Sequence, residues 1–133
     1  MGHRMTTVLL DTHILLWWLQ GGSQLSAKAK ATLQDPGVRV LVSAASAWEI
    51  AIKHKAGKLD AATALVARFE SAIEAESFAE LAISVRHAVE AGLLRGSHRD
   101  PFDRMLIAQA RVEGVPVVST DKCFDDYGVP RLW

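Results

Sequence analysis

The sequence has a single cysteine, Cys123, which excludes a disulfide within the chain and a cysteine-rich zinc site. No two of its histidines have the spacing of zinc ligands, so we do not expect a zinc site. The apolar stretch over residues 7–19 is interrupted by Asp11 and His13 and is too short to span a membrane. These absences fit a protein of the reducing cytoplasm that makes no contact with a membrane.

The chain also lacks an excess of positive charge, since 15 basic residues balance 15 acidic ones. A protein that binds nucleic acid by its overall charge would be basic, so any such site must come from a local arrangement of charges. Half of the 133 residues are apolar, which suits one compact domain. We expect a single domain over residues 1–133, with 1–5 a disordered or upstream extension and either Met1 or Met5 the native start.

Short β-prone runs alternate with helical segments along the chain, which predicts an α/β fold with a parallel sheet. We expect strands at residues 7–10, 38–42, 81–83, 115–119 and 131–133. We expect helices at residues 12–20, 26–34, from Ser43 or Ser46 to about 57, 60–75, 85–91 and 101–113. No internal repeat or linker divides these elements into separate domains.

Four acidic residues fall where such a sheet places its active crevice. Asp11 follows the first predicted strand and Asp121 follows the fourth, and the carboxyl ends of parallel strands meet at one edge. Glu49 lies about one turn into the helix after the second strand, and Asp103 lies in the first turn of the helix after a basic loop. The order of elements therefore predicts that four carboxylates, distant in sequence, gather at one rim of the sheet.

Carboxylates that converge in a crevice repel one another, and divalent cations relieve that repulsion. Oxygen ligands suit Mg²⁺ or Mn²⁺ better than Zn²⁺. Two such ions about 4 Å apart can activate a water molecule and stabilise the leaving oxygen of a phosphodiester. Each acid also has a structural interpretation: Asp11, Asp103 and Asp121 could stabilise helix starts. Glu49 could form a solvated ion pair with Lys53.

Four segments of the sequence resemble the PIN-domain (PilT N-terminal) family, and within it the VapC-like toxins of bacterial toxin–antitoxin pairs. The segments are Leu10-Asp11-Thr12-His13, Ser46-Ala47-Trp48-Glu49-Ile50, residues 100–110 and Ser119-Thr120-Asp121. The resemblance implies a three-layer α/β/α fold with a central parallel sheet of about five strands. It implies a metal-dependent endoribonuclease, active with Mg²⁺ or Mn²⁺, that a cognate antitoxin holds inactive and that forms a homodimer.

Carried over by position, the family's catalytic and metal-binding acids are Asp11, Glu49, Asp103 and Asp121. Many relatives have Asn near the fourth position, where Asp121 keeps the group ionisable. Three further residues are possible accessory groups, with plain capping or turn hydrogen bonds as the alternative: Asp100, Thr12 and Thr120.

Two basic clusters flank the proposed site and could grip the phosphates of RNA, or could simply be solvated. Their candidate RNA contacts are Lys53, Lys55, Arg99 and Arg104.

Two other functions compete with the nuclease. A phosphatase or phosphotransferase of the haloacid-dehalogenase type also uses an Asp after its first strand and Mg²⁺, but it needs a second Asp where this chain has His13. A catalytically silent PIN-like binding module is the other alternative, although all four acids are present.

Overall fold

The computed structural model of the chain describes residues 6–58 and 63–133. At its centre is a five-stranded sheet with the order β3-β2-β1-β4-β5, in which every neighbouring pair is parallel. The strands are β1 (Thr6–Leu10), β2 (Val38–Ser43), β3 (Ala79–Leu81), β4 (Val117–Val118) and β5 (Arg131–Leu132). The predicted parallel α/β sheet is confirmed.

The central strands are apolar on both sides because each face of the sheet is covered. In β1, Val8 and Leu10 join one buried cluster, while Leu9 joins the other. In β4, Val118 and Val117 divide in the same way. This alternation with a period of two explains why the strands appear in the sequence as continuous apolar runs.

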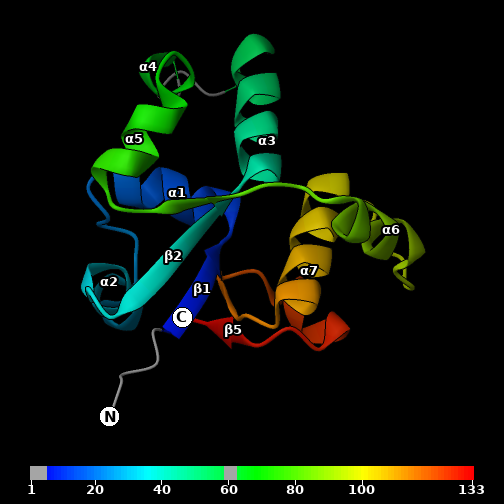
Figure 1. Cartoon of the computed structure of the whole chain (residues 1–133). Coiled ribbons are helices and arrows are strands. Elements are labelled where there is room, and N and C mark those ends of the chain that lie inside the picture. The colour runs from blue at the N-terminus through cyan, green and yellow to red at the C-terminus, as the bar shows by residue number, and fades with distance from the viewer. Residues whose placement is uncertain (1–5, 59–62) are drawn as a thin grey trace.

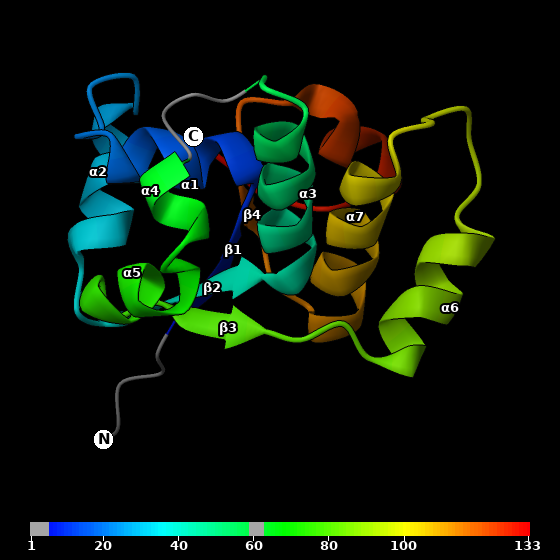
Figure 2. The same cartoon turned by 90° about the horizontal axis from the view of Figure 1, so that it is seen from above.

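Helices cover both faces, so the fold has three layers (Figure 1). One face packs against α1 (Thr12–Leu19), α2 (Ala27–Gln34), α4 (Thr63–Val66) and α5 (Phe69–Ala75). The other packs against α7 (Pro101–Glu113) and the 3-10 helix η2 (Lys122–Tyr127). Figure 2 shows α3 (Ala44–Lys55) beside α7, with α6 (Val85–Leu93) at the outer edge. No helix among the described residues is long and apolar enough to cross a membrane.

Polar side chains fix where the helices around the site begin. Ser43, rather than Ser46, caps α3 by accepting a hydrogen bond from the backbone N–H of Ala45. Asp100 caps α7, whose first residue is Pro101, and α7 ends at Gly114 in the left-handed conformation (φ +67°). These caps place Glu49 in the second turn of α3 and Asp103 in the first turn of α7.

Three elements differ from the predicted ones. The third strand begins earlier, at Ala79, because Ala79–Leu81 pair with β2 whereas Ile83 is left 37% exposed. The predicted helix over residues 60–75 starts outside the described residues, and its described part is two short helices interrupted at Arg68, where the backbone leaves the helical region (φ −147°). The fourth strand is shortened to Val117–Val118 because Pro116 has no N–H to donate to a neighbour.

Candidate metal centre

The site begins where the chain order of the sheet reverses. After β1, the chain builds β2 and β3 on one side, and β4 and β5 lie on the other. In α/β sheets, the crevice at the carboxyl end of such a switch point is where ligands bind. Asp11 directly follows β1 and Ser119 directly follows β4, so both residues stand at this crevice.

Asp11 is buried and its two carboxylate oxygens are held in place. Oδ1 accepts a hydrogen bond from the backbone N–H of Thr12 at 2.8 Å, and Oδ2 accepts one from the Ser119 hydroxyl at 2.6 Å. The imidazole Nδ1 of His13 lies 3.4 Å from Oδ2. Burial raises the pKa of Asp11 above its usual value, and the Ser119 hydrogen bond and His13 oppose that effect only in part. The carboxylate therefore lacks a full counter-charge.

Asp121 is tied to the same hydroxyl. Its backbone N–H donates to the Ser119 oxygen at 2.9 Å, and its side-chain Oδ1 accepts a hydrogen bond from the backbone N–H of Cys123 at 2.9 Å. Ser119 therefore links the loop after β4 to Asp11. The predicted capping role of Asp121 exists, since it begins η2, but it occupies only one of the two carboxylate oxygens.

Glu49 reaches the crevice from α3 and is only 7% exposed. Its Oε2 lies 2.7 Å from the ammonium of Lys53, one turn further along the helix. The hydrogen bond to Glu49 raises the pKa of Lys53 above its usual value. The predicted i,i+4 ion pair is therefore present, with a buried carboxylate and a Lys53 side chain that is 48% exposed. Lys53 is the one lysine among the described residues that line the crevice.

Asp103 lies in the first turn of α7, where Asp100 accepts hydrogen bonds from the N–H groups of Phe102 and Asp103. Its Oδ2 lies 2.9 Å from Nε2 of His98. Burial, together with the nearby carboxylates of Asp100 and Asp11, raises the pKa of Asp103 to about 6, and the His98 hydrogen bond opposes that effect only in part. Such a group binds a proton or a cation more readily than a fully solvated aspartate does.

All four predicted acids line one cleft of about 470 Å³, which we call the acidic cleft. Its lining residues are Asp11, Thr12, His13, Leu16, Trp17, Gln20, Glu49, Ile50, Lys53, Asp100, Asp103 and Asp121. Within residues 6–58 and 63–133, no three of these carboxylates approach within 4.8 Å of one another. Five acids facing one lysine, with the pKa values of Asp11 and Asp103 raised, form an oxygen donor set that fits hard divalent cations.

The family model of the PIN domain, compared with the sequence, matches residues 8–130 of this chain. The chain belongs to the PIN-domain family. Ribonuclease VapC22 of Mycobacterium tuberculosis is 29% identical to this PIN domain over 128 residues, which are 96% of each chain. The family and the three-layer fold expected from the four sequence segments are thereby confirmed.

Solved toxin structures share the fold at low sequence identity. A VapBC2 structure from Rickettsia felis, bound to a DNA fragment from the promoter, matches with a TM-score of 0.68 and 14% identity over 96% of this chain and 100% of the other. VapC20 of Mycobacterium tuberculosis, a toxin that cleaves the sarcin–ricin loop, matches with a TM-score of 0.61 and 18% identity over 92% and 95%.

The accessory candidates have structural partners as well as positions at the site. Asp100 lines the acidic cleft and caps α7, so both interpretations hold together. The hydroxyl of Thr12 lies 2.9 Å from that of Ser46, which ties the start of α1 to α3. Thr120 is exposed, and its hydroxyl lies 3.0 Å from Nε2 of His13. Both threonines therefore position groups beside Asp11 in this PIN domain.

The candidate RNA contacts differ in their surroundings. Lys53 lines the acidic cleft, and Lys55 is exposed near the end of α3. Arg99 is exposed and lines a second cavity. Arg104 turns inward and donates to the backbone carbonyls of Leu94 and His98, so it anchors the loop before α7. Among the four, Arg104 has the weakest support as an RNA contact.

The second cavity has a volume of about 940 Å³, and we call it the arginine groove. Its lining residues are Glu90, Leu93, Leu94, Arg95, Gly96, Ser97, His98, Arg99, Arg111, Asp126 and Tyr127. Because His98 also contacts Asp103, the groove adjoins the acidic cleft.

Three polar residues of the site escaped the predicted set: Ser46, His98 and Ser119. Ser46 precedes Glu49 by three residues and therefore lies on the same helix face, a signal that the sequence contains. Ser119 precedes Asp121 by two residues, in the predicted strand end. His98 lies in an irregular loop, which has no helical or strand period from which the direction of its side chain could be predicted.

Proposed function

We propose that this PIN domain is the toxin of a bacterial toxin–antitoxin pair and cuts RNA with Mg²⁺ or Mn²⁺ held by Asp11, Glu49, Asp103 and Asp121. The chain is a VapC-type endoribonuclease, a metal-dependent hydrolase of phosphodiester bonds. One observation carries the assignment of residues: four acids from four distant segments line a single cleft, and two of them have pKa values raised chiefly by burial.

The residues of the acidic cleft have different roles in this proposal. Divalent ions bound there would activate a water molecule and stabilise the charge on the leaving oxygen, which predicts products with 5′-phosphate and 3′-hydroxyl ends. Ser119 and the N–H of Thr12 orient the carboxylate of Asp11, and His98 orients that of Asp103. Lys53 neutralises Glu49 and presents a positive charge at the rim for a phosphate of the substrate.

The partners belong to the same proposal: an RNA substrate, a cognate antitoxin protein and a second copy of the chain, all in the cytoplasm. The chain exposes apolar side chains that suit such contacts, among them Val85, Val89 and Leu93 along one face of α6. Contiguous apolar surface of this kind is typical of protein interfaces. Structural relatives include a toxin–antitoxin complex from Klebsiella pneumoniae.

Cleavage of RNA by the purified full-length protein tests this function. We expect cleavage with Mg²⁺ or Mn²⁺, its loss in EDTA and its recovery with added Mn²⁺. Asp103→Asn removes one charge with little change in shape and should abolish cleavage with the fold intact, as checked by circular dichroism. Expression should arrest growth, and co-expression of the neighbouring reading frame should relieve the arrest.

The matched control is Asp35→Asn, which makes the same chemical change at an exposed acid outside both the acidic cleft and the arginine groove. It should cleave like the wild type. Full activity in Asp103→Asn would overturn the assignment of the acids. Uptake of RNA without cleavage at any metal concentration would favour the silent binding module, and a phosphoenzyme trapped on Asp11 would favour the phosphatase.

A further inference from the structure

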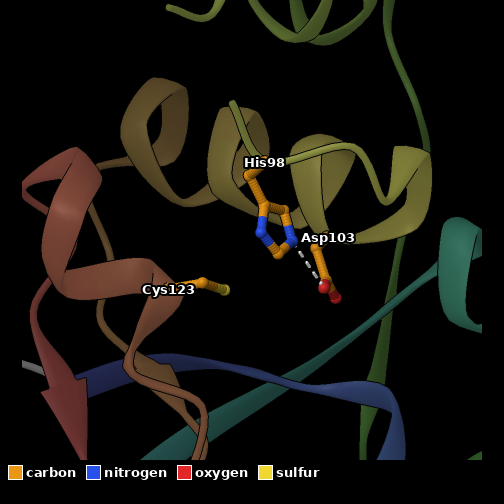
Figure 3. A group of neighbouring side chains, drawn as sticks. All are labelled: His98, Asp103 and Cys123. Carbon is orange, nitrogen blue, oxygen red and sulfur yellow. Dashed lines mark hydrogen bonds and ion pairs between the residues drawn. The ribbon is translucent and has the colours of Figure 1, made fainter. Parts of the chain in front are cut away.

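Three side chains with different metal-binding atoms meet beside the acidic cleft: His98, Asp103 and Cys123 (Figure 3). They come from the loop before α7, the first turn of α7 and the helix η2. Their nitrogen, oxygen and sulfur atoms all lie within 4.8 Å of one another, and all three residues are half-buried. Among the described residues, no other group of three histidines, cysteines or acids is this compact.

The donor set differs in kind from that of the acidic cleft. Nitrogen and sulfur ligands select Zn²⁺, whereas Mg²⁺ takes oxygen. With Zn–S of about 2.3 Å and Zn–N of about 2.0 Å, ligand atoms of a tetrahedral site stand roughly 3.3–3.6 Å apart. Nε2 of His98 and Oδ2 of Asp103 are 2.9 Å apart, so they need to separate by roughly 0.4 Å to bind one ion. The sulfur of Cys123 lies within 4.8 Å of both atoms. Three protein ligands leave the fourth position to water.

The backbone around two of these ligands is held independently of any metal. Arg104 donates to the carbonyl of His98 and so fixes the loop that carries the imidazole. The N–H of Cys123 donates to the carboxylate of Asp121, which fixes the first turn of η2. A site whose supporting backbone is ordered in advance loses less entropy when it binds.

We propose that His98, Asp103 and Cys123 form a Zn²⁺ site that inhibits the nuclease, because Zn²⁺ bound there occupies the Asp103 carboxylate. The inhibition rests on the proposed role of Asp103 in RNA cleavage, whereas the binding does not. As Zn²⁺ binds, the Cys123 thiol releases its proton to solvent. The proton shared between Nε2 of His98 and Oδ2 of Asp103 also leaves these two atoms, and the neutral imidazole keeps its single proton on Nδ1. No electron is transferred. The spacing of the three residues in the sequence, at 98, 103 and 123, resembles no zinc motif, so only the fold brings them together.

Binding is tested with Co²⁺, a spectroscopic substitute for Zn²⁺, added to the full-length protein. We expect one equivalent of Co²⁺ to produce a near-ultraviolet thiolate-to-metal band that Zn²⁺ abolishes. Cys123→Ser should lose the band, and His98→Asn should bind Zn²⁺ at least tenfold more weakly in a chelator competition. His54→Asn, a histidine change on α3, is the control and should bind like the wild type. Absence of the band, or equal Zn²⁺ affinity in Cys123→Ser and the wild type, overturns the site.

Inhibition is tested separately by RNA cleavage at constant Mg²⁺. Micromolar Zn²⁺ should inhibit the wild type, and Cys123→Ser, which retains Asp103 and full basal cleavage, should require at least tenfold more Zn²⁺. Equal inhibition of the two proteins overturns the inhibitory role. If neither protein cleaves RNA, the proposed function fails, while the Co²⁺ band still decides the zinc site.

Discussion

The acidic cleft and the arginine groove adjoin at His98, yet they differ in size and in charge. The arginine groove has about twice the volume, 940 Å³ against 470 Å³, and three arginines line it together with two acids. The smaller cleft has five acids and one lysine. The charge of each cavity, rather than its volume, decides which ligand it binds. Buried carboxylates without counter-charges bind cations strongly, whereas each exposed arginine binds a phosphate only weakly.

The difference suggests a division of labour along one RNA strand. The acidic cleft would hold the scissile phosphate through its metal ions, and the arginine groove would hold neighbouring phosphates. A neutral chain can then bind a polyanion, because its charges are separated locally rather than in total.

The largest expected effect is on the cleavage rate, and it is seen by replacing one acid from each cavity. Asp11→Asn should lower the cleavage rate about 10³-fold or more, since on the proposed function it removes a charge that holds the metal, worth several kcal/mol in the transition state. Glu90→Gln, which breaks only the ion pair with Arg111 in the arginine groove, should change the rate less than about threefold. Single-turnover cleavage at saturating Mg²⁺ measures both. Comparable losses in the two variants would contradict the separation of roles.

The second effect is the dependence of metal binding on pH. Burial raises the pKa of Asp103 from 3.8 to about 6, so its proton competes with the metal below that pH. At a fixed, subsaturating Mg²⁺ concentration, cleavage should fall about tenfold for each pH unit below 6. A tenfold increase in Mg²⁺ should move the half-maximal pH down by about one unit.

The same shift predicts an opposite trend for the metal-free protein. Because the folded state binds the Asp103 proton more tightly than the unfolded state, stability is greatest at low pH for this group and falls as pH rises through the window from 3.8 to about 6. Asp103→Asn should remove this trend in thermal unfolding followed in EDTA. A difference in melting temperature between the wild type and Asp103→Asn that stays constant across the window would contradict the raised pKa.

The gathering of the acids in one cleft and the parallel sheet were predictable because both follow from short-range patterns. Asp11 and Asp121 end apolar runs, and parallel strands bring such ends to one edge. Glu49 and Asp103 followed from their places early in the predicted helices, and the family segments then matched all four acids. The boundaries of β3 and the interruption at Arg68 were not predictable, because pairing with β2 and packing of α5 override the local helical and strand preferences.

The arginine groove and the inward turn of Arg104 could not be read from the sequence. Arg99 and Arg104 stand five residues apart in one basic segment, and composition treats them alike. In the structure Arg99 is exposed in the loop before α7, whereas Arg104, in the first turn of α7, donates a hydrogen bond to a backbone carbonyl of that loop. Loop direction depends on such long-range hydrogen bonds rather than on a repeat.

The third effect tests the groove itself. Arg99→Ala should weaken RNA binding several-fold at low salt and leave the rate at saturating RNA unchanged, because a phosphate contact adds affinity without acting on the reacting bond. The slope of log affinity against log salt should become shallower by about one unit. Binding measured over a salt series, with EDTA present to prevent cleavage, provides the check. An unchanged slope would place the RNA elsewhere.

The smallest effect on RNA binding is expected at Arg104. Arg104→Gln removes the same charge as Arg99→Ala, but its guanidinium already donates to the carbonyls of Leu94 and His98, so the salt slope should stay within error of the wild type. The loss should appear instead as about 2 kcal/mol of stability, since carbonyls in the loop lose a charged donor. Thermal unfolding and the salt series together separate the two arginines. A shallower slope with unchanged stability would show that Arg104 leaves the loop and contacts RNA.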